Sequence, residues 1–270
     1  MDKDNQTNLT PDEIARALLF AQQVIPGAGN IALRFFRQPL EVDNKLGQGG
    51  FDPVTSADRA VEAFLREELG RRFPDFGIIG EEQGVTLGSS DVNWVIDPID
   101  GTKAFISGFP TWGILLGLQQ GDRALAGLMY QPATGELFFG SAAGGALRQH
   151  GKTVALKTRS TERLEDATLY CTHESMFVDQ THLAAFRRIA AKARLQRFGG
   201  DCYAYCMLAL GQIDLVVEDT LQPYDIVPLI PIIEAAGGVV TDARGKSPVA
   251  GGFVVAAASR QLHEEAMSLL

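Results

Sequence analysis

The sequence contains few of the side chains on which several enzyme classes depend. Its 270 residues include 4 histidines and 3 cysteines. The histidines show neither a His-x-His nor a His-x-x-x-His spacing, which argues against a zinc site or a histidine base. The cysteines, Cys171, Cys202 and Cys206, form no Cys-x-x-Cys pair and cannot all be joined in disulfides. We therefore expect reduced thiols and a cytoplasmic protein.

Long apolar segments and several catalytic motifs are also absent. No apolar run reaches the roughly 18 residues that a membrane helix requires, and the first ten residues lack the apolar stretch of a secretory signal. The chain has no P-loop, no glycine-rich dinucleotide fingerprint after a strand and no Gly-x-Ser-x-Gly elbow. The sequence thus argues against a membrane protein, P-loop nucleotide hydrolysis and serine esterase chemistry.

Positive charge is in the minority. The chain has 24 Lys+Arg against 33 Asp+Glu, which gives a formal net charge of −9 and a pI near 5.0. Such a chain is a poor partner for nucleic acid, so no nucleic-acid partner is expected. A phosphate substrate would have to be held by local cations, such as metal ions, because the overall field repels it.

The composition is that of an ordinary globular protein, with 46% hydrophobic and 21% charged residues. No linker, charge block or repeat divides the chain. We expect one unit of layered strands and helices over residues 1–270, with residues 1–9 as a disordered lead. Two subdomains would fit this length, but the composition marks no boundary between them.

Local signals predict most of the helices and strands. Thr10-Pro11-Asp12-Glu13 has the features of a helix start, and Thr55 begins a second helix. Apolar runs predict strands at 93–97, 111–118, 213–217, 239–241 and 253–256, and a hairpin at 124–130 and 136–139. Further helices are expected at 199–210 and at 223–238, where Pro228 and Pro231 must bend the helix or move its start. Helical acidic residues beside basic ones, as in Glu62 to Glu68, are interpreted as solvated.

Three other acidic segments lie at the ends of apolar segments. Glu81 and Glu82 follow Ile78-Ile79-Gly80, where an exposed turn is the ordinary explanation. In Asp97-Pro98-Ile99-Asp100-Gly101-Thr102, the proline is expected to stop a buried strand, and Asp100-Gly101 to turn the chain towards a helix start. Asp225 precedes an apolar helix, whose dipole alone would explain an aspartate there.

Brought together, these carboxylates would form a site of hard oxygen ligands suited to Mg²⁺. Gly101 would let the backbone approach a ligand closely, and a helix start after it would favour an anion. A weaker candidate is Asp52, whereas Asp58 is explained by capping with Thr55. From the residues alone, catalysis and a structural cation both remain open.

At this point the chain resembles the inositol monophosphatase superfamily of Mg²⁺-dependent phosphatases, from Thr10 to about Ala258. The motifs that carry the resemblance are Gly80-Glu81-Glu82, the segment from Trp94 to Thr102, and Tyr224-Asp225 followed by Glu234-Ala-Ala-Gly-Gly238. The resemblance implies an αβαβα sandwich and a homodimer.

The resemblance also implies roles for individual residues. Metal ligation falls to Glu81, Asp97, Asp100, Asp225 and the carbonyl of Ile99. Glu82 and Asp52 match outer positions that hold metal-bound waters, and Asp52 joins Glu81 and Thr102 as a candidate catalytic residue. Gly101 and Thr102 match the positions whose backbone amides receive phosphate, and the Thr102 hydroxyl lies near the attacking water.

The third motif departs from the inositol-type pattern, because Pro223-Tyr224-Asp225 stands where tryptophan usually precedes the aspartate. This variant is similar to the histidinol-phosphatase branch. Histidinol phosphate carries an ammonium group, so its site should offer carboxylates beyond those used on metals. Asp201 and Glu218 fall in the region that contacts the alcohol, although a helix cap would equally explain Asp201. Tyr203 could stack on the imidazole, whereas Trp112 is expected in the core.

The predicted reaction is hydrolysis of a small phosphate monoester by water, with two or three Mg²⁺ ions per site. Histidinol phosphate is the expected substrate. Inositol 1-phosphate, a sugar phosphate or a nucleotide phosphate is the alternative within the same class. A non-catalytic module holding a structural cation is the alternative from another class, but it does not require Gly101 and Thr102.

Overall fold

The described part of the protein contains two large β-sheets with helices on their faces and one short two-stranded sheet. The structure is a computed structural model that describes residues 8–39, 42–44 and 53–270. The strands of the larger sheet are β3 (Gly77–Gly80), β4 (Gly84–Thr86), β5 (Val92–Asp100), β6 (Gly113–Gln120), β7 (Arg123–Gln131), β8 (Glu136–Ser141), β9 (Gly144–Gln149) and β10 (Lys152–Ala155). Those of the smaller sheet are β11 (Thr168–Cys171), β12 (Leu195–Phe198), β13 (Leu215–Leu221), β14 (Val239–Asp242) and β15 (Gly252–Ala257). A separate pair consists of β1 (Val42–Asn44) and β2 (Pro53–Thr55).

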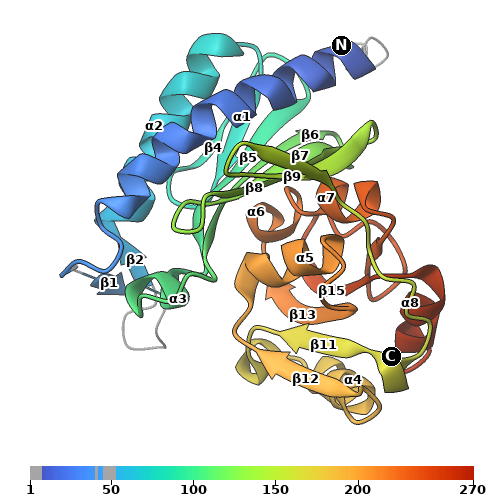
Figure 1. The fold of residues 1–270 in the computed structure, drawn as a ribbon. Coiled ribbons are helices and arrows are strands. Elements are labelled where there is room, and N and C mark those ends of the chain that lie inside the picture. Colours follow the sequence, from blue (N-terminus) through green and yellow to red (C-terminus); the bar gives the residue numbers. More distant parts are fainter. Residues whose placement is uncertain (1–7, 40–41, 45–52) are drawn as a thin grey trace.

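The helices are α1 (Pro11–Leu33), α2 (Ser56–Arg72), α3 (Thr102–Ile106), α4 (Gln180–Ala190), α5 (Asp201–Ala209), α6 (Pro223–Ile226), α7 (Ile230–Ala235) and α8 (Arg260–Met267). Among the described residues, short 3-10 turns span Leu164–Asp166 and Glu174–Met176. Figure 1 shows α1 and α2 on one face of the larger sheet, and α5, α6 and α7 between the two sheets. Helices α4 and α8 cover the far face of the smaller sheet. The predicted αβαβα layering is therefore confirmed.

The larger sheet is mostly antiparallel, in the order β10-β9-β8-β7-β6-β5-β3-β4. Its exception near the site is β3, which runs parallel to β5 and pairs Gly80 with Ile96. Because the two strands run in the same direction, the residues that follow each of them emerge at the same edge. The smaller sheet has the order β12-β11-β13-β15-β14.

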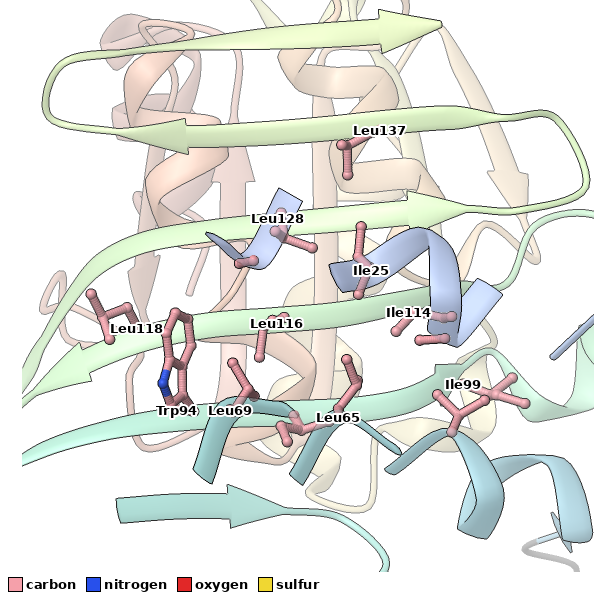
Figure 2. Close-up of a cluster of buried hydrophobic side chains, with 14 of the residues drawn as sticks. Ile25, Leu65, Leu69, Trp94, Ile99, Ile114, Leu116, Leu118, Leu128 and Leu137 are labelled. Atoms are coloured by element: carbon pink, nitrogen blue, oxygen red, sulfur yellow. The ribbon is translucent and has the colours of Figure 1, made fainter. Parts of the chain in front are cut away.

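Three apolar clusters lie between these layers. The first joins α1 and α2 to the larger sheet, and Figure 2 shows the helix residues Ile25, Leu65 and Leu69 near the sheet residues Leu116 and Leu128 in this cluster. The second fills the space between the sheets around α5 and α7. The third lies between the smaller sheet and helices α4 and α8. Burying a side chain such as Leu65 contributes about 1.5–3 kcal/mol, so the three clusters hold the layers together.

Both predicted N-terminal helix caps are present. In α1, Thr10 and Glu13 form a capping box, in which the Glu13 side chain accepts a hydrogen bond of 2.8 Å from the Thr10 N–H. In α2, Thr55 and Asp58 form the same motif, with a distance of 2.9 Å from the Thr55 N to Asp58 Oδ2. Capping thus accounts for Asp58, as the sequence predicted.

Three local predictions need correction. Strand β5 does not stop at Pro98 but continues to Asp100, with a shift of its register against β6 between Asp97 and Asp100 that accommodates the missing proline N–H. The segment 223–238 is not one helix, because α6 and α7 are separate around Pro228, whereas Pro231 lies at the start of α7 as the alternative of a moved helix start predicted. Glu62 is not solvated: its exposed fraction is 0%. None of the helices in the described part of the chain is long and apolar enough to cross a membrane.

Candidate active site

The predicted site residues converge on one cleft of about 710 Å³. The segments that line it come from both sheets and from the helix layer between them. The predicted residues on its walls are Glu81, Asp97, Ile99, Asp100, Gly101, Thr102, Asp201, Glu218 and Asp225. Glu82 is half-buried and adjoins this wall through Glu81. Asp52 lies outside the described residues.

A cluster of three aspartates forms the floor of the cleft. Carboxylate oxygens of Asp97, Asp100 and Asp225 lie within 4.8 Å of one another. Backbone N–H groups hold each carboxylate: Asp97 accepts from Ile99 at 3.0 Å, Asp100 from Cys202 at 3.0 Å, and Asp225 from Gln222 at 2.7 Å. The bond to Gln222 is part of a capping box at the start of α6. Asp225 therefore serves the helix start and the cluster at once.

The cluster is strained electrostatically. Burial, followed by the nearby charges of Glu81, Asp100 and Asp225, raises the pKa of Asp97 well above its ordinary value. Burial also raises the pKa of Asp225 to about 7. Several buried carboxylates at this spacing repel one another unless protons or a cation compensate them. Their all-oxygen donor set fits a hard divalent cation, to which the backbone carbonyl of Ile99 and the neighbouring Glu81 could contribute.

The Asp-Gly-Thr bend forms a second wall. Gly101 has a φ of +81°, a left-handed conformation that glycine adopts without strain. A Cβ atom at this position would lie 3.1 Å from Cβ of Asp201, so a larger residue would also crowd the cleft. The Thr102 hydroxyl donates to the carbonyl oxygen of Ile99 at 3.1 Å, which fixes the hydroxyl next to the aspartate cluster.

Two further carboxylates face the same cleft. Asp201 has a φ of +44°, and the cap of α5 is Gly200, with no side-chain cap bond. The helix-cap explanation for Asp201 is therefore wrong. Glu218 accepts from the Thr172 N–H at 2.7 Å and from the Tyr205 hydroxyl at 2.9 Å. Burial first, and then the charge of Glu218, raises the pKa of Asp201 to about 7.

Glu62 lies near the site and is buried, although its position beside basic residues in the sequence predicted a solvated side chain. Its buried carboxylate accepts a hydrogen bond of 2.7 Å from the N–H of Glu82, directly after Glu81. A sequence signal was available, because Glu62 lies on the face of α2 that also carries the buried Asp58, Leu65 and Leu69. A carboxylate on a buried helix face requires polar partners.

An apolar pocket of about 850 Å³ adjoins the cleft, and Lys103 and Asp201 line both cavities. Phe198 and Tyr203 are among its aromatic residues. The Tyr203 hydroxyl donates to Glu136 at 2.7 Å, which fixes its ring. Trp112, in contrast, has an exposed fraction of 0% and belongs to the core, as predicted.

Comparisons with known proteins show that this chain is similar to phosphatases. The model of the inositol monophosphatase family matches residues 14–270. The chain is 34% identical to the protein named bifunctional phosphatase IMPL2, chloroplastic, from Arabidopsis thaliana, covering 100% of this chain and 79% of that protein. It is 32% identical to a histidinol-phosphatase from Chlorobaculum parvum, over 90% of each. A solved inositol monophosphatase structure from Zymomonas mobilis superposes with a TM-score of 0.82 at 35% identity, covering 94% of this chain and 97% of that one.

Proposed function

The chain belongs to the inositol monophosphatase family, and we propose that within this family it hydrolyses histidinol phosphate, a monoester whose alcohol carries positive charge. The family and the relatives are phosphatases, so the chain is a phosphoric monoester hydrolase. The family is metal-dependent, and the acidic cluster provides the matching ligands. The identity of the ion as Mg²⁺ and of the substrate are the proposed parts.

The observation that supports this substrate is the surplus of carboxylates in the cleft. Asp97, Asp100 and Asp225 lie close enough together to hold a cation. Asp201 and Glu218 lie on the same walls, so the cleft offers two carboxyl groups beyond those proposed to hold the metal. A neutral sugar alcohol would gain only hydrogen bonds from them, whereas an ammonium group would also offset their charge. The neighbouring pocket with Tyr203 offers an aromatic surface for an imidazole.

When bound, a divalent metal would supply positive charge that neutralises phosphate oxygens and stabilises the attacking and leaving oxygens. The groups that would hold two or three Mg²⁺ ions in the proposed site are the side chains of Asp97, Asp100, Asp225 and Glu81 and the carbonyl of Ile99. The other protein groups orient the reactants around them.

Thr102 is proposed to orient the attacking water. Its hydroxyl donates to Ile99 O, so its lone pairs remain as acceptors for a proton of the water. The backbone amides of Gly101 and Thr102 are proposed to contact the phosphate, as the family resemblance implies. Glu81 and Asp52 complete the proposed catalytic group, and Glu82 supports it from an outer position.

The alternative within the class is inositol 1-phosphate, a sugar phosphate or a nucleotide phosphate. The similarity to an inositol monophosphatase of known structure supports it, but the surplus carboxylates do not. A non-catalytic cation module has no support, because the chain's family and relatives are phosphatases.

A substrate panel tests the proposal. Phosphate release would be measured from histidinol phosphate, inositol 1-phosphate and an adenosine bisphosphate, with Mg²⁺ and then with EDTA. We expect kcat/KM for histidinol phosphate to be at least about 10-fold higher than for the other two, the size of effect that one additional charged contact provides. Equal or greater activity on a neutral ester would reject histidinol phosphate as the substrate.

We also propose that the protein is a homodimer and that it is located in the cytoplasm. A homodimer would be detected by light scattering coupled to gel filtration. A cytoplasmic location would be detected by fractionation of the cells that produce the protein.

A further inference from the structure

We propose that Glu62 and Arg66 of α2 are positioning residues that hold the turn carrying Glu81, and that they thereby set the affinity of the cleft for Mg²⁺. The inference rests on the proposed function, in which Glu81 helps to hold the metal. It goes beyond that function by assigning a role to a buried ion pair on a helix outside the cleft.

The first step of the argument is the placement of the Glu62 carboxylate. It is fully buried, so its charge must be compensated by close partners. Its two oxygens accept from the N–H groups of Glu82 at 2.7 Å and Gln83 at 3.0 Å. These two groups directly follow Glu81 in the chain. The carboxylate therefore fixes the backbone on one side of Glu81.

Arg66 extends this contact to the other end of the turn. Its Nε donates to Glu62 at 2.7 Å, one helical turn away on α2. Its Nη1 donates to the Thr86 hydroxyl at 3.0 Å, and its Nη2 donates to the Gly84 carbonyl oxygen. The planar guanidinium group is suited to such simultaneous contacts. Together, Glu62 and Arg66 contact the turn at residues 82 and 83 and the strand β4 that follows it at residues 84 and 86.

Gly80 provides independent evidence for the close contact between the Glu62–Arg66 ion pair and the end of β3. A Cβ atom at position 80 would lie 2.3 Å from Oε1 of Glu62 and 2.7 Å from Nη2 of Arg66. Only glycine permits the ion pair to come so close to the end of β3. Gly80, the residue before Glu81, therefore leaves the space that the ion pair of Glu62 and Arg66 occupies.

Apart from the pairing of β4 with β3, the turn is largely open to solvent. Residues 83–87 are exposed, and the exposed fractions of Val85 and Leu87 are 61% and 87%. On its other side, the Glu81 N–H donates to the carbonyl oxygen of Ile96 on β5 at 3.2 Å. Glu81 thus lies between the β5 backbone next to Asp97 and the ion pair on α2. Loosening the ion pair would let the Glu81 side chain move relative to Asp97.

The test is a titration of Mg²⁺ into metal-free protein, measured by calorimetry, together with the Mg²⁺ dependence of phosphate release. In Glu62→Gln the side chain keeps its size but can accept at only one atom. We expect the dissociation constant for Mg²⁺ to rise about 10-fold, as is typical when a partner of a metal ligand is lost. KM for the phosphate ester at saturating Mg²⁺ should change less than about 2-fold, because neither Glu62 nor Arg66 lines the cleft.

Asp214 provides a matched control. It is also fully buried, pairs with Arg159 at 3.3 Å and accepts from the Thr168 N–H at 2.8 Å, but it lies beside the smaller sheet and does not line the cleft. Asp214→Asn should lower the thermal midpoint without changing the Mg²⁺ affinity. If Glu62→Gln lowers the midpoint but leaves the Mg²⁺ dissociation constant unchanged, the ion pair is merely structural and the inference is wrong.

Arg66→Met and Arg66→Lys keep the test decisive if Glu62→Gln does not fold. Arg66 has a side-chain exposure of 12%, so the lysine variant can keep its charge near Glu62 while losing the contacts to Gly84 and Thr86. We expect a smaller loss of Mg²⁺ affinity for lysine than for methionine, and wild-type affinity in both would also overturn the inference. Mg²⁺ binding without phosphate release in the wild-type chain would contradict the proposed function alone. No Mg²⁺ binding at all would contradict both.

Discussion

The backbone N–H of Cys202 donates a 3.0 Å hydrogen bond to Oδ1 of Asp100, across 102 residues of sequence. Asp100 ends a strand of the larger sheet, and Cys202 lies in the first turn of α5, between the sheets. The same turn presents Asp201 against Gly101. One contact therefore places the acidic cluster of the larger sheet beside the carboxylates that are proposed to recognise the alcohol.

Asp97→Asn should abolish metal-dependent turnover. The substitution removes one negative charge from the cluster of Asp97, Asp100 and Asp225, so we expect kcat/KM to fall by about 100-fold or more. The circular dichroism spectrum should stay unchanged, since asparagine and aspartate side chains have nearly the same volume. Asp122→Asn, on an exposed turn, is the control. Full activity of Asp97→Asn would remove this residue from the proposed site.

Mg²⁺ should stabilise the folded protein. The buried carboxylates repel one another, and a cation relieves this repulsion only in the folded state. At about 100 times the dissociation constant, ligand binding contributes about 2.7 kcal/mol, which corresponds to a rise of about 5–10 °C in the thermal midpoint. Scanning calorimetry with MgCl₂, and with NaCl at equal ionic strength, would measure it. A rise of the same size with NaCl would mean screening of charge and not a metal site.

Asp201→Asn should discriminate between charged and neutral substrates. The variant keeps the shape of the side chain but loses the charge that is proposed to attract an ammonium group. A hydrogen bond to a charged group contributes about 1.5–3 kcal/mol, so kcat/KM for histidinol phosphate should fall at least about 10-fold. For inositol 1-phosphate it should change less than about 2-fold. Equal losses on both esters would contradict the recognition of the ammonium group.

His263 should make the stability depend on pH. Burial first, and then the charge of Arg260, lowers the pKa of His263 from its ordinary value of 6.5. The unfolded chain thus binds more protons between the two pKa values, so His263 contributes full stability above pH 6.5 and loses it as pH falls towards the folded-state pKa. Its Nε2 lies 2.8 Å from the Thr241 hydroxyl, a contact that glutamine can preserve.

Urea unfolding of the wild-type chain and of His263→Gln would measure this effect. Between pH 7.5 and pH 5 the wild type should lose more free energy of unfolding than the variant. His150→Gln, at an exposed position, should follow the wild type. Parallel curves for the wild type and His263→Gln would show that His263 does not contribute to the pH dependence.

The local signals of the sequence predicted the presence of helices and strands better than they predicted where these elements end. The predictions of helix caps at Thr10 and Thr55 were correct, because a capping box involves only residues within one helical turn. The prediction that the strand stops at Pro98 was wrong, because the pairing of β5 with β6 continues past the proline after a shift of register. Whether a strand survives a proline depends on its neighbours, which the local sequence does not contain.

Glu62 illustrates the same limit for side chains. In the sequence, Glu62 and Arg66 have the i, i+4 spacing that is typical of an exposed ion pair on a helix. Glu62 is buried because β3 and its following turn pack onto this face of α2, so that Glu82 and Gln83 donate to it. That contact crosses 20 residues to Glu82, and nothing in the helical pattern identifies the partner.

By itself, the sequence determined the layered class of fold, the acidic segments at strand ends and the family, because these depend on periodicity, capping and contiguous motifs such as Asp97 to Thr102. Only the tertiary structure decided that Asp225 joins Asp97 and Asp100, that Asp201 faces the cleft and does not cap its helix, and that Glu62 is buried. The physical reason is that burial and the repulsion between carboxylates depend on which segments meet in space, and distance along the chain does not define this.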